Sequence, residues 1–483
     1  MAMKEFIFSN VLHELANNKV SRNFLLKKLD SYLYSSIVEN DEKNLQEVQE
    51  KKYKFMKSML KSAVRNVEKG YFSGSVFKRI IHVLVENSFL NRQKYSDKLE
   101  EFRAQYGEYP PNFIVLSPTQ RCNLNCTGCY ASSNSRSSAA LPYDMVDKIV
   151  YDVRNKFHIR FVTISGGEPF MYKSQGKTLL DIFEKYDDVF FLVYTNGTLI
   201  TPEVAERLGK MGNVTPAISV EGFEKETDER RGKGTHQKIL KAFENLRNAG
   251  VPIGISVTAT SKNADMLLDD TFYDYYFDQQ GVTYMWQFQL MPMGRSAQDF
   301  DLMVPPKKRV ELYRKWEELI SEKEYCVADF WNSGVLVNGC IAYGRRGGYF
   351  YIDWNGNIMP CVFVPYYVDN IYDLYNNGKD LVDALFSDFM KNGREWARNY
   401  GQAYPHDPNN WLMPCSIRDH YANFRENILP DHARGESEEA EETLRNNEYY
   451  NKLVEYDQEL ENLTQDIWEK EYKKREKQKS TSS

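Results

Sequence analysis

A regular alternation of short apolar runs with longer helix-like stretches, between residues 112 and 296, constrains the fold of this chain more than any other feature. Stretches such as Tyr143–Phe157 and His236–Asn248 have helical length, and the runs between them have strand length. The runs predicted as strands are Phe113–Leu116, Phe161–Ile164, Val189–Val193, Pro216–Val220, Ile253–Val257 and Met285–Leu290. Because strands joined by helical crossovers run parallel, the sequence predicts the α/β class.

The chain before and after this alternation has a different character. Its 483 residues exceed what one hydrophobic core usually organises. Residues 1–108 are predicted as a helical extension that ends at Pro110 and Pro111, because apolar residues recur at helical spacing in Phe55, Met59, Ala63 and Val67 and again in Phe77, Ile80, Ile81 and Leu84. We predict one large domain over 109–300, and a smaller one over 301–430 with turns at Gly339–Cys340, Gly347–Gly348 and Asn355–Gly356.

Residues 431–483 are predicted as an acidic linker followed by a helix. The segment 435–442 is rich in glutamate, and the helix carries an apolar stripe of Leu453, Tyr456, Leu460, Leu463 and Ile467. The stripe covers only about two heptads, and sustained coiled coils need three or more. We therefore expect this helix to dock onto its own chain, with pairing to a partner helix as the alternative.

Composition narrows the class of protein. Hydrophobic residues at 42% and charged residues at 27% are typical of a globular protein, and no apolar run reaches the ~18 residues of a membrane span. Glu5 and Asn10 interrupt the N-terminal apolar stretch, so we expect neither a secretory signal nor a transmembrane segment, and a cytoplasmic location. A net charge of −6 disfavours a nucleic-acid partner. Seven cysteines without an export signal indicate thiolate ligation of a metal rather than disulfides.

Three cysteines follow the first predicted strand closely. Cys122, Cys126 and Cys129 have C-x3-C-x2-C spacing within Arg121–Tyr130. A cubane iron–sulfur cluster held by three thiolates keeps one iron open for a further ligand. A zinc site, the alternative, is normally closed by a fourth Cys or His at short spacing, and none follows Cys129 nearby. The spacing favours a [4Fe-4S] cluster.

This cysteine motif resembles the signature of the radical S-adenosylmethionine (SAM) superfamily. The resemblance covers about residues 112–296 and implies a partial (β/α)6 TIM-like barrel. It also implies that the open iron chelates SAM, which is reductively cleaved to a 5′-deoxyadenosyl radical that abstracts hydrogen from a substrate. The family usually has a bulky residue just before the third cysteine, whereas this chain has Gly128 there and Tyr130 just after.

Further strand ends match the same family. The segment Ser165-Gly166-Gly167-Glu168-Pro169, after the second predicted strand, resembles the GGEP motif that holds the methionine amino group of SAM, although it is also compatible with a structural turn. Asn196 follows the third strand, and Ser219 and Glu221 end the fourth, where the family contacts the ribose and carboxylate of SAM. Met291–Arg295 ends the sixth strand. Arg230 and Arg231 are predicted as a solvated charge run, with contact to a carboxylate as the alternative.

A second cysteine set lies beyond the barrel. Cys340 and Cys361 enclose Gly356 in a C-x15-G-x4-C pattern that resembles the opening of SPASM and twitch domains, which hold auxiliary [4Fe-4S] clusters. The resemblance implies one auxiliary cluster on Cys340, Cys361 and Cys415, with Cys326, His420, a carboxylate or the substrate as fourth ligand. Buried free cysteines are the alternative. We expect Cys326 to be a core residue and His420 to be structural.

The sequence thus predicts a radical SAM oxidoreductase and assigns no catalytic residue beyond the cofactor ligands. Resemblance to SPASM-type proteins implies maturation of a peptide or protein, with an electron donor such as flavodoxin or ferredoxin. Radical modification of a lipid or other small metabolite is one alternative, because the N-terminal apolar stripes can cover an apolar entrance. A non-catalytic zinc-binding scaffold is the alternative from another class, but it leaves the GGEP segment unexplained.

Overall fold

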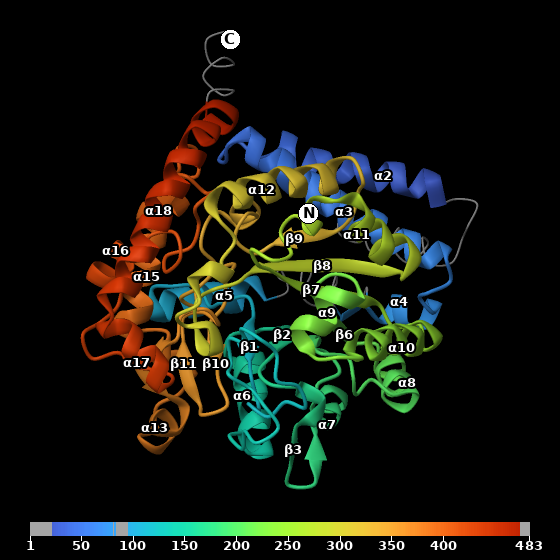
Figure 1. Ribbon diagram of the computed structural model, residues 1–483, viewed down its shortest axis with the longest axis horizontal. Coiled ribbons are helices and arrows are strands. Elements are labelled where there is room, and N and C mark those ends of the chain that lie inside the picture. The colour runs from blue at the N-terminus through green and yellow to red at the C-terminus, as the bar shows by residue number, and fades with distance from the viewer. Residues whose placement is uncertain (1–21, 81, 84–94, 474–483) are drawn as a thin grey trace.

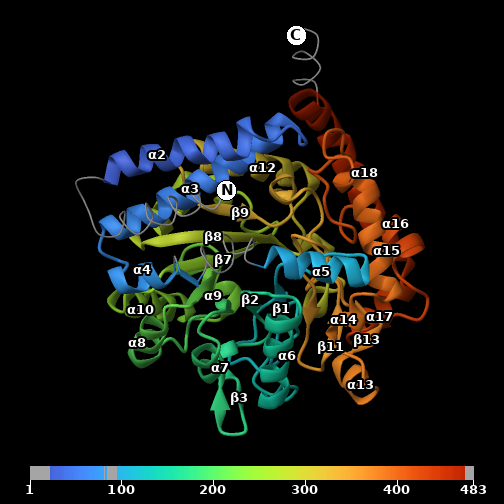
Figure 2. The same ribbon diagram turned by 180° about the vertical axis from the view of Figure 1, so that it is seen from behind.

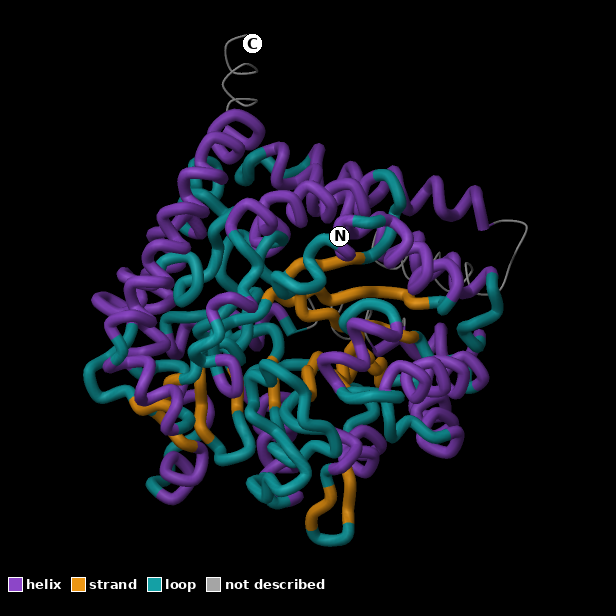
Figure 3. The backbone as a smooth tube through the Cα atoms, in the orientation of Figure 1, coloured by secondary structure: helices purple, strands orange, loops and turns teal. Residues whose placement is uncertain are grey.

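In the computed structural model, which describes residues 22–80, 82–83 and 95–473, one sheet of ten strands forms the centre (Figures 1 and 3). The predicted strands are confirmed as neighbours in chain order, all parallel: β1 (Ile114–Leu116), β2 (Phe161–Ile164), β5 (Phe190–Thr195), β6 (Val214–Val220), β7 (Ile253–Ala259) and β8 (Val282–Gln289). The helices that join them lie on the outside of the sheet, which is the arrangement of a partial TIM-like barrel.

Strands from the C-terminal part of the chain extend this sheet at both edges. β9 (Val327–Asp329) pairs with β8, and β10 (Tyr351–Ile352) pairs with β1, both in parallel. β11 (Asn357–Met359) and β13 (Asp369–Asn370) continue beyond β10 as antiparallel strands. The predicted turn at Asn355–Gly356 joins β10 to β11, with Gly356 at a φ of 81°. The predicted domains 109–300 and 301–430 therefore share one sheet, and a boundary near residue 300 stays a prediction.

Short ribbons and helices surround the sheet. The ribbons pair β3 (Lys173–Ser174) with β4 (Lys177–Thr178), and β12 (Tyr366–Tyr367) with β14 (Arg434–Gly435). The helices of the barrel are α6 (Tyr143–Lys156), α7 (Leu179–Lys185), α8 (Pro202–Met211), α9 (Glu224–Arg231), α10 (Thr235–Asn248), α11 (Asp270–Asp274) and α12 (Pro306–Ser321). Among the described residues, no helix is long and apolar enough to cross a bilayer.

The N-terminal extension forms α2 (Arg22–Tyr34), α3 (Gln46–Glu68), α4 (Gly74–Ile80) and α5 (Ser96–Tyr106). Figures 1 and 2 both place α2 and α3 beside α12, and α5 beside β1. The face that α3 buries differs from the predicted stripe, since Met59 is 39% exposed whereas Ser62 and Asn66 are fully buried. Ser62 Oγ accepts the Cys326 N–H at 3.1 Å, and Asn66 Nδ2 donates to Gly281 O at 2.9 Å. These contacts require a close approach that small polar residues allow. Ile81 and Leu84 of the second predicted stripe lie outside the described residues.

The C-terminal part contributes α13 (Ile371–Asn376), α14 (Leu381–Ala384), α15 (Asp388–Ala397), α16 (Tyr421–Asn423), α17 (Glu438–Arg445) and α18 (Asn447–Ile467). The acidic segment is only partly a linker, because α17 begins within it. The Ser437 side chain accepts the Ala440 N–H, and glutamates in the first turn favour the positive end of the helix dipole. α18 docks onto its own chain as predicted: Tyr449 and Tyr456 donate to the carbonyls of Pro292 and Val304 at 2.9 and 3.1 Å.

Inside the barrel, the ring of Tyr284 on β8 crosses over Gly254 on β7. A Cβ at Gly254 would lie 2.1 Å from the Tyr284 ring. The Tyr284 hydroxyl lies 2.9 Å from Thr215 Oγ1 on β6, which holds the ring across the strands. The next residues on the same face, two positions further along each strand, are Ser219 on β6, Ser256 on β7 and Trp286 on β8. They lie side by side in register. Because Tyr284 fills the layer below, these residues face the space above it.

We predict that Gly254→Ala lowers the free energy of unfolding by about 1–3 kcal/mol, the usual cost of overpacking a core. Urea denaturation followed by circular dichroism measures the loss. Gly74→Ala is the matched control, because a Cβ at Gly74 meets nothing within 4 Å. Adding Tyr284→Ala to Gly254→Ala relieves the clash, so the two changes together cost less than their sum. If the losses in unfolding free energy of the two single variants add up to that of the double variant, the Tyr284 ring does not pack over Gly254.

Candidate functional site

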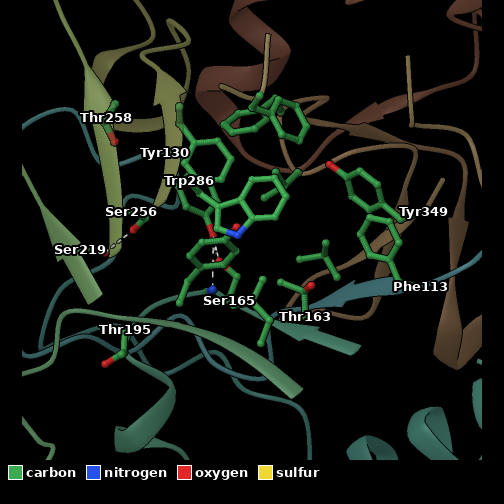
Figure 4. A pocket seen from close by; sticks show the side chains of 18 of the residues that line it. Phe113, Tyr130, Thr163, Ser165, Thr195, Ser219, Ser256, Thr258, Trp286 and Tyr349 are labelled. Carbon is green, nitrogen blue, oxygen red and sulfur yellow. Dashed lines mark hydrogen bonds between the residues drawn. The ribbon is translucent and has the colours of Figure 1, made fainter. Parts of the chain in front are cut away.

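A cavity of about 530 Å³ lies inside the barrel, above Tyr284. Cys122, Cys126 and Cys129 line one part of it together with Gly166, Gly167, Asn196 and Ser219, so the structure brings these predicted residues to one place. Figure 4 shows Trp286 in the middle of the cavity, with Ser219, Ser256 and Thr258 on one side and Phe113 and Tyr349 on the other. The cavity thus joins the cysteine loop after β1 to the segment around Tyr349.

Donors from the cysteine loop and from two neighbouring elements approach its sulfurs. Cys122 Sγ accepts the Leu124 N–H at 3.4 Å, and Asn196 Nδ2 lies 3.8 Å from the same sulfur. Arg231 Nη1 lies 4.0 Å from Cys126 Sγ. Burial raises the pKa of the Cys122 thiol to about 11, so a deprotonated Cys122 needs compensating positive charge. The loop is suited to thiolates bound to iron.

The GGEP segment packs directly against this loop. Gly167 N–H donates to Thr119 O, and Glu168 N–H donates to Arg121 O, both at 2.8 Å. A Cβ at Gly167 would lie 2.2 Å from Arg121 O, so only glycine fits there. The structural and ligand-binding interpretations of the motif are therefore compatible, since the glycines hold the two loops together beside the cavity.

Glu168 and Pro169 lie behind the cavity wall. The fully buried Glu168 accepts from Thr195 Oγ1 at 2.7 Å, Phe170 N at 3.1 Å and Asn196 N at 2.8 Å. Burial raises the pKa of Glu168, while these donors oppose that shift. Pro169 starts the short helix that Glu168 caps. Both residues fix the end of β2 and its neighbour β5.

Tyr130, which directly follows the third cysteine, contacts the GGEP segment and the cavity. Its hydroxyl lies 2.9 Å from Ser165 Oγ and accepts the Gly166 N–H at 3.3 Å. Its ring lines the cavity (Figure 4). Gly128 stands where the family has a bulky residue, and a Cβ there would come within 3.2 Å of Leu290. Tyr130 supplies aromatic surface from the other side of Cys129.

The prediction of a solvated charge run at Arg230 and Arg231 is wrong. Their side chains are only 16% and 13% exposed and pair with the buried Glu221 at 2.6 and 2.5 Å. Helix α9 turns both guanidinium groups back toward the strand end, so the charges meet a carboxylate instead of solvent. Glu221 Oε2 is buried and has no hydrogen-bond partner among the described residues. Glu221 does not line the cavity, whereas Arg230 and Arg231, which it holds in place, do.

Sequence patterns alone missed the role of Arg295. Its guanidinium donates to the carbonyls of Cys126 and Ser133, and its backbone N–H donates to Cys129 O at 3.0 Å. Gly294 allows this approach, because a Cβ there would lie 2.1 Å from Tyr130 O. The end of β8 therefore clamps the cysteine loop. The sequence signal that pointed to Arg295 was its position just after a predicted strand.

Cys340, Cys361 and Cys415 come from separate loops and lie near one another. Burial raises the pKa of the Cys415 thiol well above its usual value, and the charges of Asp419, Cys340 and Cys361 raise it further. The neighbouring residues Ile341, Val362 and Phe363 line the same cavity as the first cysteine set. The first set thus lines the cavity directly, whereas the second set lies behind residues that line it.

Two of the candidate fourth ligands, Cys326 and His420, lie in structural surroundings. The buried Cys326 donates its backbone N–H to Ser62 under α3, in agreement with the prediction of a core residue. His420 Nε2 lies 2.9 Å from Met413 O, and its ring packs against Trp396 and Tyr400 at 5.5 and 4.6 Å between centroids. His420 therefore has the contacts of a structural residue.

The first donor set fits a cluster. Across the residues that the structure describes, no three or more His, Cys, Asp or Glu side chains are arranged to hold a single metal ion. In a cubane each thiolate binds a different iron, so its cysteines do not share one centre. Three thiols on one cavity wall, with N–H donors aimed at Cys122, fit a [4Fe-4S] cluster.

Comparison with known proteins agrees with this geometry. Residues 116–268 match the family described as the Radical SAM superfamily. Mycofactocin maturase MftC of Mycolicibacterium smegmatis is 30% identical over 283 residues, which are 57% of this chain and 69% of that protein. An AdoMet-dependent heme synthase of Methanosarcina barkeri is 26% identical over 293 residues, 54% of this chain and 79% of that protein.

A solved structure supports the fold. The structure described as native anSMEcpe with bound AdoMet and Cp18Cys peptide aligns with a TM-score of 0.50 at 18% identity, covering 74% of this chain and 100% of that one. Relatives named as a maturase and a synthase make this protein an enzyme rather than a non-catalytic zinc-binding scaffold. The chain belongs to the radical SAM superfamily of enzymes, which work with a [4Fe-4S] cluster and S-adenosylmethionine.

Proposed function

We propose that this enzyme matures a peptide or protein by hydrogen abstraction, with Cys122, Cys126 and Cys129 as the ligands of its SAM-binding cluster. The observation that carries the proposal is the common cavity, which these cysteines, Gly166, Gly167 and Ser219 line together. When bound, the cluster and SAM supply the reductive cleavage that generates a 5′-deoxyadenosyl radical. The residues of the chain bind and orient SAM and the substrate and exclude water.

The residues around the cysteine loop hold the SAM site. Gly166 and Gly167 leave backbone exposed to the cavity for the methionine part of SAM, and Glu168 with Pro169 fixes their loop from behind. Asn196 connects Glu168 to Cys122 through its own backbone and side chain. Ser219 offers a hydroxyl from β6, and Glu221 holds Arg231 beside Cys126 while keeping one oxygen free.

The substrate side of the proposal rests on the relatives and on the second cysteine set. A relative is named a maturase, and the solved neighbour with this fold was determined with a peptide. We propose Cys340, Cys361 and Cys415 as ligands of an auxiliary [4Fe-4S] cluster that accepts an electron from the product or binds the substrate. A cytoplasmic location, with flavodoxin or ferredoxin as electron donor, completes the proposal.

A second candidate is radical modification of an apolar metabolite. Aromatic side chains dominate the cavity between the two cysteine sets, among them Phe113, Phe161, Trp286, Phe288, Phe330 and Phe363. Such a lining suits an aromatic side chain of a peptide and also a flat or lipid-like small molecule. Profiling of peptides and metabolites in cells that lack the protein separates the two classes.

We expect Cys126→Ala to abolish SAM cleavage, because loss of one thiolate leaves the SAM-binding cluster without its three-point attachment. The measurement is 5′-deoxyadenosine formed after anaerobic reconstitution and reduction. Cys326→Ala is the matched control, since Cys326 lies in the core under α3. Undiminished cleavage by the Cys126 variant contradicts the assignment of the cluster.

Tyr130→Phe is expected to weaken SAM binding about fivefold to tenfold, since it leaves the Gly166 N–H without its acceptor and a lost hydrogen bond costs about 1 kcal/mol. Titration of the reconstituted protein with SAM, followed by electron paramagnetic resonance (EPR), gives the Kd. In Tyr284→Phe the affected hydroxyl contacts Thr215 below the cavity, so the affinity should not change. Equal Kd values for Tyr130→Phe and the wild type rule out this role.

Cys361→Ala should still cleave SAM but release no correct product, because Cys361 belongs to the auxiliary set and not to the loop after β1. Parallel assays of 5′-deoxyadenosine and modified substrate make the distinction. If Cys361→Ala forms the full amount of product, no auxiliary cluster on Cys361 takes part in the reaction.

A further inference from the structure

Tyr349 separates the cavity from Cys361. Its ring lines the cavity and stacks on Phe113 with centroids 5.0 Å apart and planes at 18° (Figure 4). The residue is only 2% exposed. A substrate in the cavity therefore meets the Tyr349 ring before it reaches the second cysteine set.

The hydroxyl of Tyr349 contacts sulfur directly. The distance from Tyr349 Oη to Cys361 Sγ is 2.9 Å, and Phe363 N–H approaches the same sulfur at 3.5 Å. A cysteine that binds iron is a thiolate and carries no proton, so the tyrosine hydroxyl is the donor.

We propose that Tyr349 is a positioning residue that raises the reduction potential of the auxiliary site through its hydrogen bond to Cys361. This inference rests on the proposed function, because it takes Cys340, Cys361 and Cys415 as cluster ligands. Hydrogen bonds to cluster sulfurs help to set the potential of an iron–sulfur site. Reduction adds negative charge to the sulfurs, so a donor stabilises the reduced form more than the oxidised one.

The hydrogen bond from Tyr349 to Cys361 lies in surroundings that strengthen its influence on the reduction potential. Ile341, Val362 and Phe363 flank the cysteines and line the cavity, and they keep the surroundings of Cys361 apolar. In apolar surroundings one hydrogen bond to a charged sulfur counts for more than it does in water. A higher potential makes the auxiliary site a better acceptor for an electron that leaves the substrate side of the cavity.

The test is an EPR-monitored redox titration of the full chain carrying Cys126→Ala, which leaves the auxiliary site as the source of the signal. In this background Tyr349→Phe keeps the ring and its stack on Phe113 but removes the donor. We expect its midpoint potential to shift to more negative values at unchanged iron content. Tyr351→Phe is the matched control, because Tyr351 is equally buried and its hydroxyl donates to Ser117 Oγ at 2.9 Å.

The outcomes are distinct. A negative shift in Tyr349→Phe, with none in Tyr351→Phe, supports the inference, and Tyr349→His should recover part of the shift by restoring a donor. An unchanged potential in Tyr349→Phe with full iron content overturns it and leaves the auxiliary cluster intact. If the Cys126→Ala chain carries no iron–sulfur signal, the auxiliary site itself is wrong, and thermal unfolding shows whether each variant is folded.

Discussion

Two loops lie against each other, backbone to backbone, at the carboxyl ends of β1 and β2, and the rest of the site depends on this contact. Gly167 and Glu168 donate to the carbonyls of Thr119 and Arg121, and the space at Gly167 admits no side chain. The contact joins the cysteine loop to the segment that we propose as part of the SAM site. Because β1 and β2 are neighbours in the sheet, their register sets the distance between the two loops.

Buried charged side chains also hold the cysteine loop in place. Glu221 holds Arg230 and Arg231, and Arg231 reaches Cys126, so positive charge stands beside a sulfur that we propose binds iron as a thiolate. A carboxylate buried alone would be costly, and the two guanidinium groups compensate it. Arg295 acts differently, since it holds the loop through carbonyl oxygens of Cys126 and Ser133. Several strand ends therefore fix one short loop.

The sequence predicted the parts that depend on local pattern. Strands β1, β2 and β5–β8 carry compact apolar runs, and the cysteine and GGEP motifs lie directly behind two of them, so order and spacing were sufficient. Parts that depend on tertiary register were not predictable in the same way. The burial of Arg230 and Arg231 follows from the direction of α9, and the buried face of α3 follows from its contacts with Cys326 and Gly281. The first depends on how α9 turns back onto the end of β6, and the second on contacts between residues far apart in the chain.

The extension of the sheet has a mechanical consequence that no motif shows. β10 pairs directly with β1, so the strand that precedes the first cysteine loop also borders the segment that carries Tyr349 and Cys361. Hydrogen-bonded neighbouring strands move together, and the separation between the two cysteine sets is therefore set by one sheet and not by a hinge between domains. Tyr351 on β10 donates to Ser117 just after β1, which adds a side-chain contact to the strand pairing. A substrate enclosed between the two sets would thus meet a cavity of fixed length, with Trp286 from β8 as its middle wall.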